Sequence, residues 1–230
     1  MAAFAGFSKS FVAFFKGLKK NNSKAYFDSK REVYDNIVKP EMEAFIAAVG
    51  AGLKKISPYF AAEPRVGGSM YRLNRDIRFS PNKLPYKTHS AALFYHQQGG
   101  RHELPAFYFQ IDPESVMFAA GHYMVSPENL DLIRRALDRN GDLLAALLKK
   151  AAFKKRFGVL EGETLKKAPR GYEEDHPHIE LLKLKQYLLS EEEPVKNWIG
   201  DPRLVKRALD SFRAAAPVVR FLCMASNVPF

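Results

Sequence analysis

The sequence predicts an α+β fold in which a central, mostly antiparallel sheet is packed by N- and C-terminal helices. Apolar residues recur at helical spacing over the first sixty residues and again beyond residue 126. Between these regions the period changes to short aromatic or β-branched runs bounded by Gly, Pro and polar turns, which are strand signals. These runs are Met70 to Phe79, Ala92 to Tyr95, Ala106 to Ile111 and Val116 to Tyr123. Because like elements cluster along the chain, we expect a single domain over residues 1–230.

The N-terminal region is expected to form three helices. Ser8 and Ser23 can cap the first two, because a serine hydroxyl accepts a hydrogen bond from an unpaired amide of the first turn. Pro40 either kinks the second helix or opens the third. The first helix is amphipathic, with lysines opposite a row of Phe and Leu side chains. This pattern favours packing into the core, and a membrane-surface anchor is the alternative.

The C-terminal region is expected to be mainly helical. Ser126-Pro127 is a cap followed by a first-turn proline and predicts a helix start. Another helix is expected over Asp142 to Phe157. After a loop, a helix is expected to start near Asp175, where Asp175 or His176 can cap it. Asp201-Pro202 is expected to cap the last helix, which Pro217 should interrupt.

Composition narrows the classes of function. The net charge is +11, from 36 Lys and Arg against 25 Asp and Glu, and it favours an anionic partner such as nucleic acid, a phosphorylated metabolite or acidic lipid. The positive charge is spread along the chain, which weakens the nucleic-acid interpretation. A single cysteine, Cys223, excludes an intramolecular disulfide and a multi-thiolate metal site. No apolar run approaches the roughly 18–20 residues of a membrane span. We therefore expect a cytoplasmic protein.

One segment, residues 71–89, has the composition of a site that holds a negative charge. Five cations surround a single acid, Asp76, and alternate with aromatic residues. The cations are Arg72, Arg75, Arg78, Lys83 and Lys87. Guanidinium groups that converge on one point bind carboxylate or phosphate strongly, because each planar fork donates two parallel hydrogen bonds.

A strand over residues 71–79 would sort these side chains onto two faces. The apolar face would carry Tyr71, Leu73, Arg75, Ile77 and Phe79. The polar face would carry Arg72, Asn74, Asp76 and Arg78, so that Asp76 can orient either flanking arginine. Arg75 would lie on the apolar face, where a partly buried guanidinium needs a partner.

Two further elements can complete the site. The turn-forming residues 80–89 can place Lys83, Tyr86 and Lys87 over the strand end as a lid. The loop over residues 170–178 can add an arginine as an anion donor and a histidine as acid or base, and helix capping is its alternative role. The catalytic candidates are Asp76, Tyr86 and His176. The ligand-binding candidates are Arg72, Arg75, Arg78, Lys83, Lys87 and Arg170.

The leading hypothesis is a cleft that binds a phosphorylated or carboxylate small molecule, with enzymatic action on that molecule left open. A balanced salt-bridge network is the structural alternative for the charged segment, but five cations against one acid leave a positive surplus. A nucleic-acid-binding protein, whose aromatic residues stack on bases, and a non-catalytic structural or interaction module also fit this composition. His176 and His178 lack the further ligands of a metal site, and no Gly-rich phosphate loop occurs, so we expect no metal and no cofactor. The oligomeric state stays open.

The charged segment also follows a longer motif, Arg-x-x-Arg-Asp-x-Arg-Phe, then Asp or Asn, then Lys-x-x-Tyr. This chain has it as Arg72, Arg75, Asp76, Arg78 and Phe79, followed by Asn82-Lys83 and Tyr86. The sequence resembles in this respect a bacterial family of about this length, numbered 2461 among the domains of unknown function. The similarity extends to Asn22 with Tyr26-Phe27, where Trp is the expected aromatic, and to Pro169-Arg-Gly-Tyr172 with His176-Pro177. The resemblance implies no activity, because none is established for that family.

Overall fold

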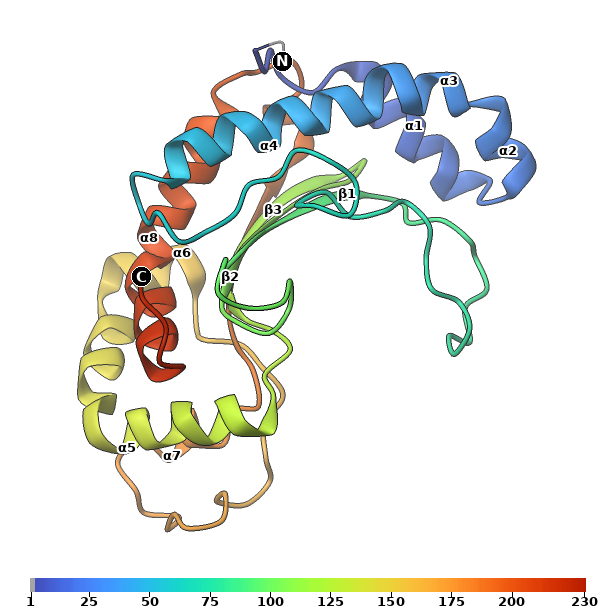
Figure 1. The fold of residues 1–230 in the computed structure, drawn as a ribbon. Helices are drawn as coiled ribbons and strands as arrows, with labels where there is room; N and C mark the ends of the chain where they lie inside the picture. The colour runs from blue at the N-terminus through green and yellow to red at the C-terminus, as the bar shows by residue number, and fades with distance from the viewer. Residues whose placement is uncertain (1–2) are drawn as a thin grey trace.

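A four-stranded antiparallel sheet with the strand order β1-β2-β3-β4 forms the centre of the molecule (Figure 1). The computed structural model describes residues 3–230. The strands are β1 (Ser90–Tyr95), β2 (Ala106–Ile111), β3 (Ser115–His122) and β4 (Tyr187–Pro194). The α+β prediction is confirmed, and three of these strands coincide with predicted runs. The predicted strand over Met70 to Phe79 is wrong, because that segment makes only isolated bridges.

Helices pack on one face of the sheet and at its ends. They are α1 (Lys9–Lys20), α2 (Lys24–Ser29), α3 (Arg31–Val33), α4 (Lys39–Leu53), α5 (Pro127–Lys149), α6 (Ala151–Phe157), α7 (Ile179–Leu182) and α8 (Leu204–Ala225). A π-helical turn, Tyr34–Val38, leads into α4, and a 3-10 turn, Val195–Asn197, follows β4. Helix α8 packs on β2 and β3, and α4 packs on α8 and β1 (Figure 1).

The predicted N-terminal caps are confirmed. The Ser8 hydroxyl accepts from the amide of Phe11 at 3.1 Å, and the Ser23 hydroxyl accepts from that of Tyr26 at 3.2 Å. Pro40 lies in the first turn of α4, which is the second of its two predicted roles. The apolar row of α1 is buried, so this helix packs into the core and does not present that face to a membrane surface. Among residues 3–230, no helix combines the length and the apolar character needed to cross a membrane.

The C-terminal helices differ from the prediction in three places. Helix α5 begins at Pro127 as expected but continues to Lys149, leaves helical geometry at Asn140, and is followed by the separate α6. Helix α7 is a single turn that begins at Ile179 rather than near Asp175. Helix α8 continues through Pro217, because buried side chains on both sides of this proline hold the two halves in the core and outweigh the cost of about 3 kcal/mol.

Strand β4 was not predicted from the sequence. Its residues Glu191, Glu192 and Glu193 are consecutive glutamates, which are depleted in strands and hide the alternating pattern. Two of them face α8, where the guanidinium of Arg207 donates to Glu191 Oε2 at 2.6 Å and to Glu193 Oε1 at 2.6 Å. A partner on another element therefore allows these carboxylates to lie on the helix-covered face.

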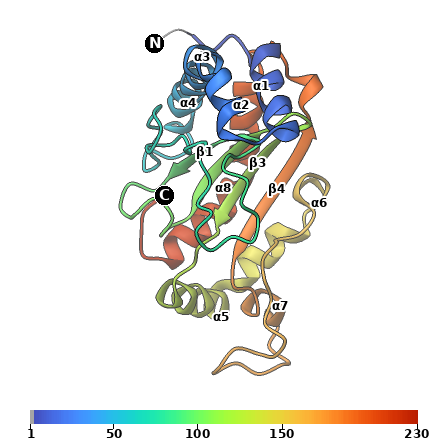
Figure 2. The same cartoon turned by 90° about the vertical axis from the view of Figure 1, so that its right-hand side faces the viewer.

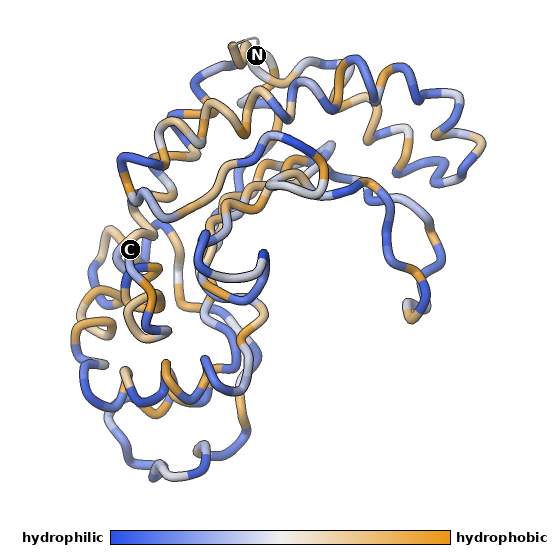
Figure 3. The backbone as a smooth tube through the Cα atoms, in the orientation of Figure 1, coloured by the Kyte–Doolittle hydropathy of each residue, from blue (hydrophilic) through white to orange (hydrophobic). Residues whose placement is uncertain are grey.

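Among residues 3–230, no helix covers the other face of the sheet (Figure 2). Figure 2 looks onto this open face, and residues 71–89 extend in front of it. We call residues 71–89 the arm. The alternation of the strands is visible in β2, where Phe107 and Phe109 are buried on the helix side and Tyr108 and Gln110 are half-buried on the open side. Figure 3 shows that the arm, on the right of this view, is largely hydrophilic with short hydrophobic stretches, whereas the sheet is more hydrophobic.

Candidate anion-binding site

The arm is an irregular hairpin rather than a strand. The amide of Arg75 donates to the carbonyl of Pro85 at 2.9 Å, and the amide of Lys87 donates to that of Leu73 at 2.9 Å. Beyond this pairing the two prolines of the returning half lack the N–H groups that a longer ladder requires. The predicted alternation holds from residue 71 to residue 78, with every second side chain exposed. It fails at Phe79, which is 94% exposed and not on an apolar face.

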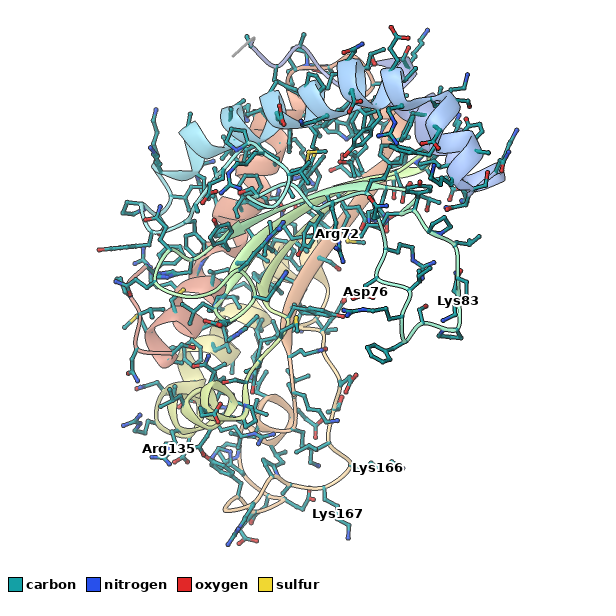
Figure 4. The ribbon with its side chains drawn as sticks, turned by 45° about the vertical axis from the view of Figure 1, so that its right-hand side comes forward. Arg72, Asp76, Lys83, Arg135, Lys166 and Lys167 are labelled. Carbon is teal, nitrogen blue, oxygen red and sulfur yellow. The ribbon has the colours of Figure 1, made fainter. Side chains whose placement is uncertain are left out.

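The cations near the tip of the arm bind the arm's own chain. Arg78 donates to both carboxylate oxygens of Asp76, at 3.0 and 2.7 Å, and its hydrogen bonds lower the pKa of Asp76 to about 2. The ammonium of Lys83 donates to the carbonyl of Ile77 at 2.9 Å. The guanidinium of Arg75 donates to the carbonyl of Leu84 at 3.0 Å, which supplies the partner that its position requires. Figure 4 shows Asp76 and Lys83 on the two facing halves of the arm.

Tyr86 anchors the arm instead of covering its end. Its side chain is only 6% exposed, and its ring lies 4.8 Å from that of Phe27, between centroids. The side-chain amide of Asn22 forms hydrogen bonds with both the carbonyl and the amide of the Tyr86 backbone. Tyr86 is therefore not part of the predicted lid, because its ring packs against the N-terminal helices.

A second group of cations lies at the foot of the arm, where the arm meets the loop between β1 and β2. The ammonium nitrogen of Lys87 lies 4.6 Å from the ring centroid of Tyr71, and the guanidinium carbon of Arg101 lies 4.3 Å from the same centroid. Arg101 also donates to the carbonyl of Ser69 at 2.9 Å, while its buried Nε has no hydrogen-bond partner among residues 3–230. Arg72 is exposed beside this group (Figure 4). We call Tyr71, Arg72, Lys87 and Arg101 the foot cluster.

The foot cluster carries an uncompensated positive charge. Within residues 3–230, none of Arg72, Lys87 and Arg101 forms an ion pair. Burial, together with the neighbouring charges of Arg101 and Arg72, lowers the pKa of Lys87. Burial likewise lowers the pKa of Arg101 and, with the charges of Arg101 and Lys87, that of His102. Burial and the neighbouring cations thus disfavour the charged forms of Lys87 and His102.

The wall next to the foot cluster is the open face of the sheet. The ring of Tyr108 lies 6.2 Å from that of Tyr71, and its hydroxyl donates to Oε1 of Gln110 at 2.8 Å. In the ladder Tyr108 pairs with Ala119, which pairs with Ser190, so that small side chains follow the aromatic one across the sheet. A cavity of about 10 Å³, lined in part by Tyr71, Arg72 and Lys87, is large enough for no more than about one water molecule. A larger ligand would lie on the open side.

A larger cavity lies elsewhere, at the start of α8. It measures about 340 Å³ and its lining includes Trp198, Arg203 and Lys206. Arg203 is paired with Asp201 at 2.6 Å, and Lys206 with Asp210 at 2.7 Å. These two cations are therefore compensated, in contrast to those of the foot cluster.

The loop that carries Arg170 and His176 does not join the arm. It lies at the opposite end of the molecule, against α5, and both views show the two segments apart (Figures 1 and 2). Nε2 of His176 lies 3.2 Å from Asp138 Oδ1, and its Nδ1 accepts from the amide of His178 at 3.0 Å. Lys166 and Lys167, labelled in Figure 4, belong to the same distant loop. Asp76 thus lies at the arm tip, Tyr86 in the core and His176 on the distant loop against α5, so these three side chains do not meet.

The sequence alone did not point to Arg101 or Tyr108. Arg101 follows Gly99-Gly100 in the loop between two predicted strands, so the sequence could have predicted its position at one end of the sheet. The sequence could not have predicted its contact with Tyr71, because a hairpin sequence does not determine the direction in which a long side chain extends. Among residues 3–230, no group of three His, Cys, Asp or Glu side chains is arranged to hold a metal ion.

The match of the chain to a family model covers both the arm and the foot cluster. The model, described as "Conserved hypothetical protein (DUF2461)", matches residues 10–221. This confirms the resemblance that the charged motif indicated. No curated protein matches the chain.

Proposed function

The chain belongs to the DUF2461 family of conserved hypothetical proteins, and we propose that it binds a small anion at the foot cluster. The observation that carries the proposal is a pair of cations, Lys87 and Arg101, over one tyrosine ring, with the charge of Arg72 acting on Lys87. None of the three forms an ion pair within residues 3–230. A phosphorylated or carboxylate small molecule would supply the missing charge, and the buried Nε of Arg101 is a donor in want of an acceptor.

The proposed ligand contacts lie at the foot of the arm and not at its tip. Arg75, Arg78 and Lys83 already donate to groups of the arm, so their role is to keep the hairpin closed. Arg72 and Lys87 remain available from the original set, and Arg101 joins them from the loop between β1 and β2. Tyr108, on the open face of the sheet, lies beside Tyr71 of the foot cluster. The free and buried thiol of Cys223 agrees with a reducing, cytoplasmic location.

Titration with inorganic phosphate, followed by amide NMR, tests the foot cluster. We expect Arg101→Met to weaken phosphate binding about tenfold or more, since a hydrogen bond to a charged group contributes about 1.5–3 kcal/mol. Arg170→Met, on the distant loop, is the matched control and should change the affinity by less than about twofold. An equal loss in Arg78→Met would instead place the anion at the arm tip. No detectable phosphate or carboxylate binding to the wild-type protein would end the proposal.

A second candidate function, nucleic-acid binding, is favoured by one observation. The ring of Phe79 is 94% exposed at the tip of a basic arm, with the guanidinium carbon of Arg78 at 5.8 Å from its centroid. Such a ring is available to stack on an unpaired base. Binding to single-stranded RNA or DNA should then weaken linearly in log affinity against log salt concentration. Absence of binding at low salt would remove this candidate.

A further inference from the structure

Lys87 differs from the other lysine of the arm in what surrounds its amine. Lys83 is exposed, and its ammonium donates to two backbone carbonyls, those of Ile77 and Arg78. Lys87 is half-buried, and its nitrogen faces the Tyr71 ring with no carboxylate and no carbonyl within hydrogen-bond distance among residues 3–230. The two amines thus lie on one short segment in opposite environments.

The groups that face Lys87 are almost all basic. Arg72 and His89 belong to the same arm, and Arg101 and His102 come from the loop between β1 and β2. The nearest acids act on its neighbours: Asp112 on His89 and Glu63 on Arg101. Glu63 is itself bound to the hydroxyl of Tyr95 and to Arg65. An amine in such a setting is more readily deprotonated, and a neighbouring cation is a known means of making a lysine nucleophilic at neutral pH.

We propose that Lys87 is a nucleophile that forms an imine with a carbonyl compound carrying a carboxylate or phosphate group. The inference rests on the proposed anion site, because Arg101 and Arg72 would hold the charged group beside the amine. The arrangement combines a half-buried amine, two guanidinium groups that form no ion pair within residues 3–230, and the open face of the sheet next to them. A 2-keto acid has this chemistry, since its carbonyl carbon is directly attached to its carboxylate.

The step needs no partner beyond the substrate. The neutral amine adds to the carbonyl carbon, forming the C–N bond, while a nitrogen proton passes through water to the carbonyl oxygen. The resulting carbinolamine loses its hydroxyl group as water, and a C=N bond to Lys87 remains. One carbonyl compound and one amine therefore give one imine and one water molecule, without oxidation or reduction.

Reductive trapping tests this assignment. The full-length protein is incubated with pyruvate and cyanoborohydride, and the modified lysine is identified by peptide mass spectrometry. We expect the adduct mainly on Lys87, its loss in Lys87→Met, and its retention in the matched variant Lys83→Met. Acetone, which has the carbonyl but no charge, should label Lys87 more slowly than pyruvate does, and Arg101→Met should slow labelling by pyruvate about tenfold.

Further outcomes separate the inference from the proposed function. Equal labelling of Lys83 and Lys87, or labelling spread over exposed lysines, overturns the nucleophile even where phosphate still binds. If the wild-type protein neither binds phosphate nor is labelled at Lys87, both the nucleophile and the proposed anion site are overturned. Trace acetylation of the wild-type protein across pH needs no variant. The midpoint of Lys87 reactivity should lie below the ordinary lysine pKa of about 10.4, and a midpoint at or above that value contradicts the inference.

Discussion

The side-chain amide of Asn22 makes both backbone hydrogen bonds of Tyr86, as a neighbouring strand would. Its Nδ2 donates to the Tyr86 carbonyl at 2.9 Å, and its Oδ1 accepts from the Tyr86 amide at 3.0 Å. Asn22 lies between α1 and α2, so the two contacts tie the arm to the N-terminal helices. Tyr86 belongs to the charged motif through which the sequence resembles its family, and Asn22 belongs to the N-terminal part of the same resemblance. Their spatial relationship gives this part of the motif a structural reason.

Replacing Asn22 should loosen the arm. Asn22→Ala leaves a partly buried amide and carbonyl without partners, and we expect it to lower the free energy of unfolding by about 1–3 kcal/mol. Chemical denaturation measures this loss, and faster proteolysis within residues 72–85 reports the opening of the arm. Asn82→Ala is the matched control at the exposed tip, where Oδ1 accepts from the Leu84 amide, and it should change stability by less than about 0.5 kcal/mol. Equal effects would contradict the anchoring role.

Tyr86 and Phe79, two of the aromatic residues of the arm, should respond differently to truncation. Tyr86→Ala removes a buried ring and should destabilise the protein by about 3–5 kcal/mol, as large aromatic-to-alanine changes in a core do. Phe79→Ala removes a ring that is 94% exposed and should leave the melting temperature unchanged. If the arm binds single-stranded nucleic acid, Phe79→Ala should lower that affinity about tenfold, because stacking contributes about 1–3 kcal/mol per base. A large stability loss in Phe79→Ala would show that its ring is packed in solution.

The carboxylate of Glu191 should matter far more than that of its neighbour. Glu191 accepts from Arg207 at 2.6 Å and from Arg156 at 2.9 Å, and its side chain is 11% exposed. Glu191→Ala leaves both guanidinium groups without this partner and should cost on the order of 3 kcal/mol in unfolding free energy. Glu192→Ala, on the open face, is the control and should be nearly neutral. Similar losses in the two variants would exclude a specific role for the buried network.

Acid should destabilise the protein through His122. This side chain is fully buried, neither ring nitrogen has a partner among residues 3–230, and burial lowers its pKa to about 4. The unfolded chain has the ordinary histidine pKa of about 6.5 and so binds the proton first. The stability contribution is therefore complete above pH of about 6.5 and decreases as the pH falls towards about 4, by on the order of 3 kcal/mol. Thermal unfolding across this range measures the effect.

His122→Leu provides the control for this pH dependence. The substitution removes the titrating group and leaves no polar partner unsatisfied, so stability at neutral pH should change little. Its curve of unfolding free energy against pH should be flatter than that of the wild type between about pH 6.5 and 4. Parallel curves would show that other groups cause the acid sensitivity.

Local rules accounted for the parts of the fold in which the interacting groups are near neighbours in the chain. The caps at Ser8 and Ser126 were predictable, because a cap and its amide lie within one helical turn. The strands that became β1, β2 and β3 were predictable from their apolar alternation. Strand β4 was not, since its glutamates become compatible with the sheet only when Arg207 of α8 lies beside them.

The sequence by itself determined the fold class, the family and the unusual surplus of positive charge near residues 71–89. Only the tertiary structure decided which of those charges are free. Arg78 and Lys83 are bound within the arm, while Lys87 meets Arg101, a residue from a different loop, over the ring of Tyr71. The physical reason is that charge depends on composition, whereas its compensation depends on distances between segments that only folding brings together.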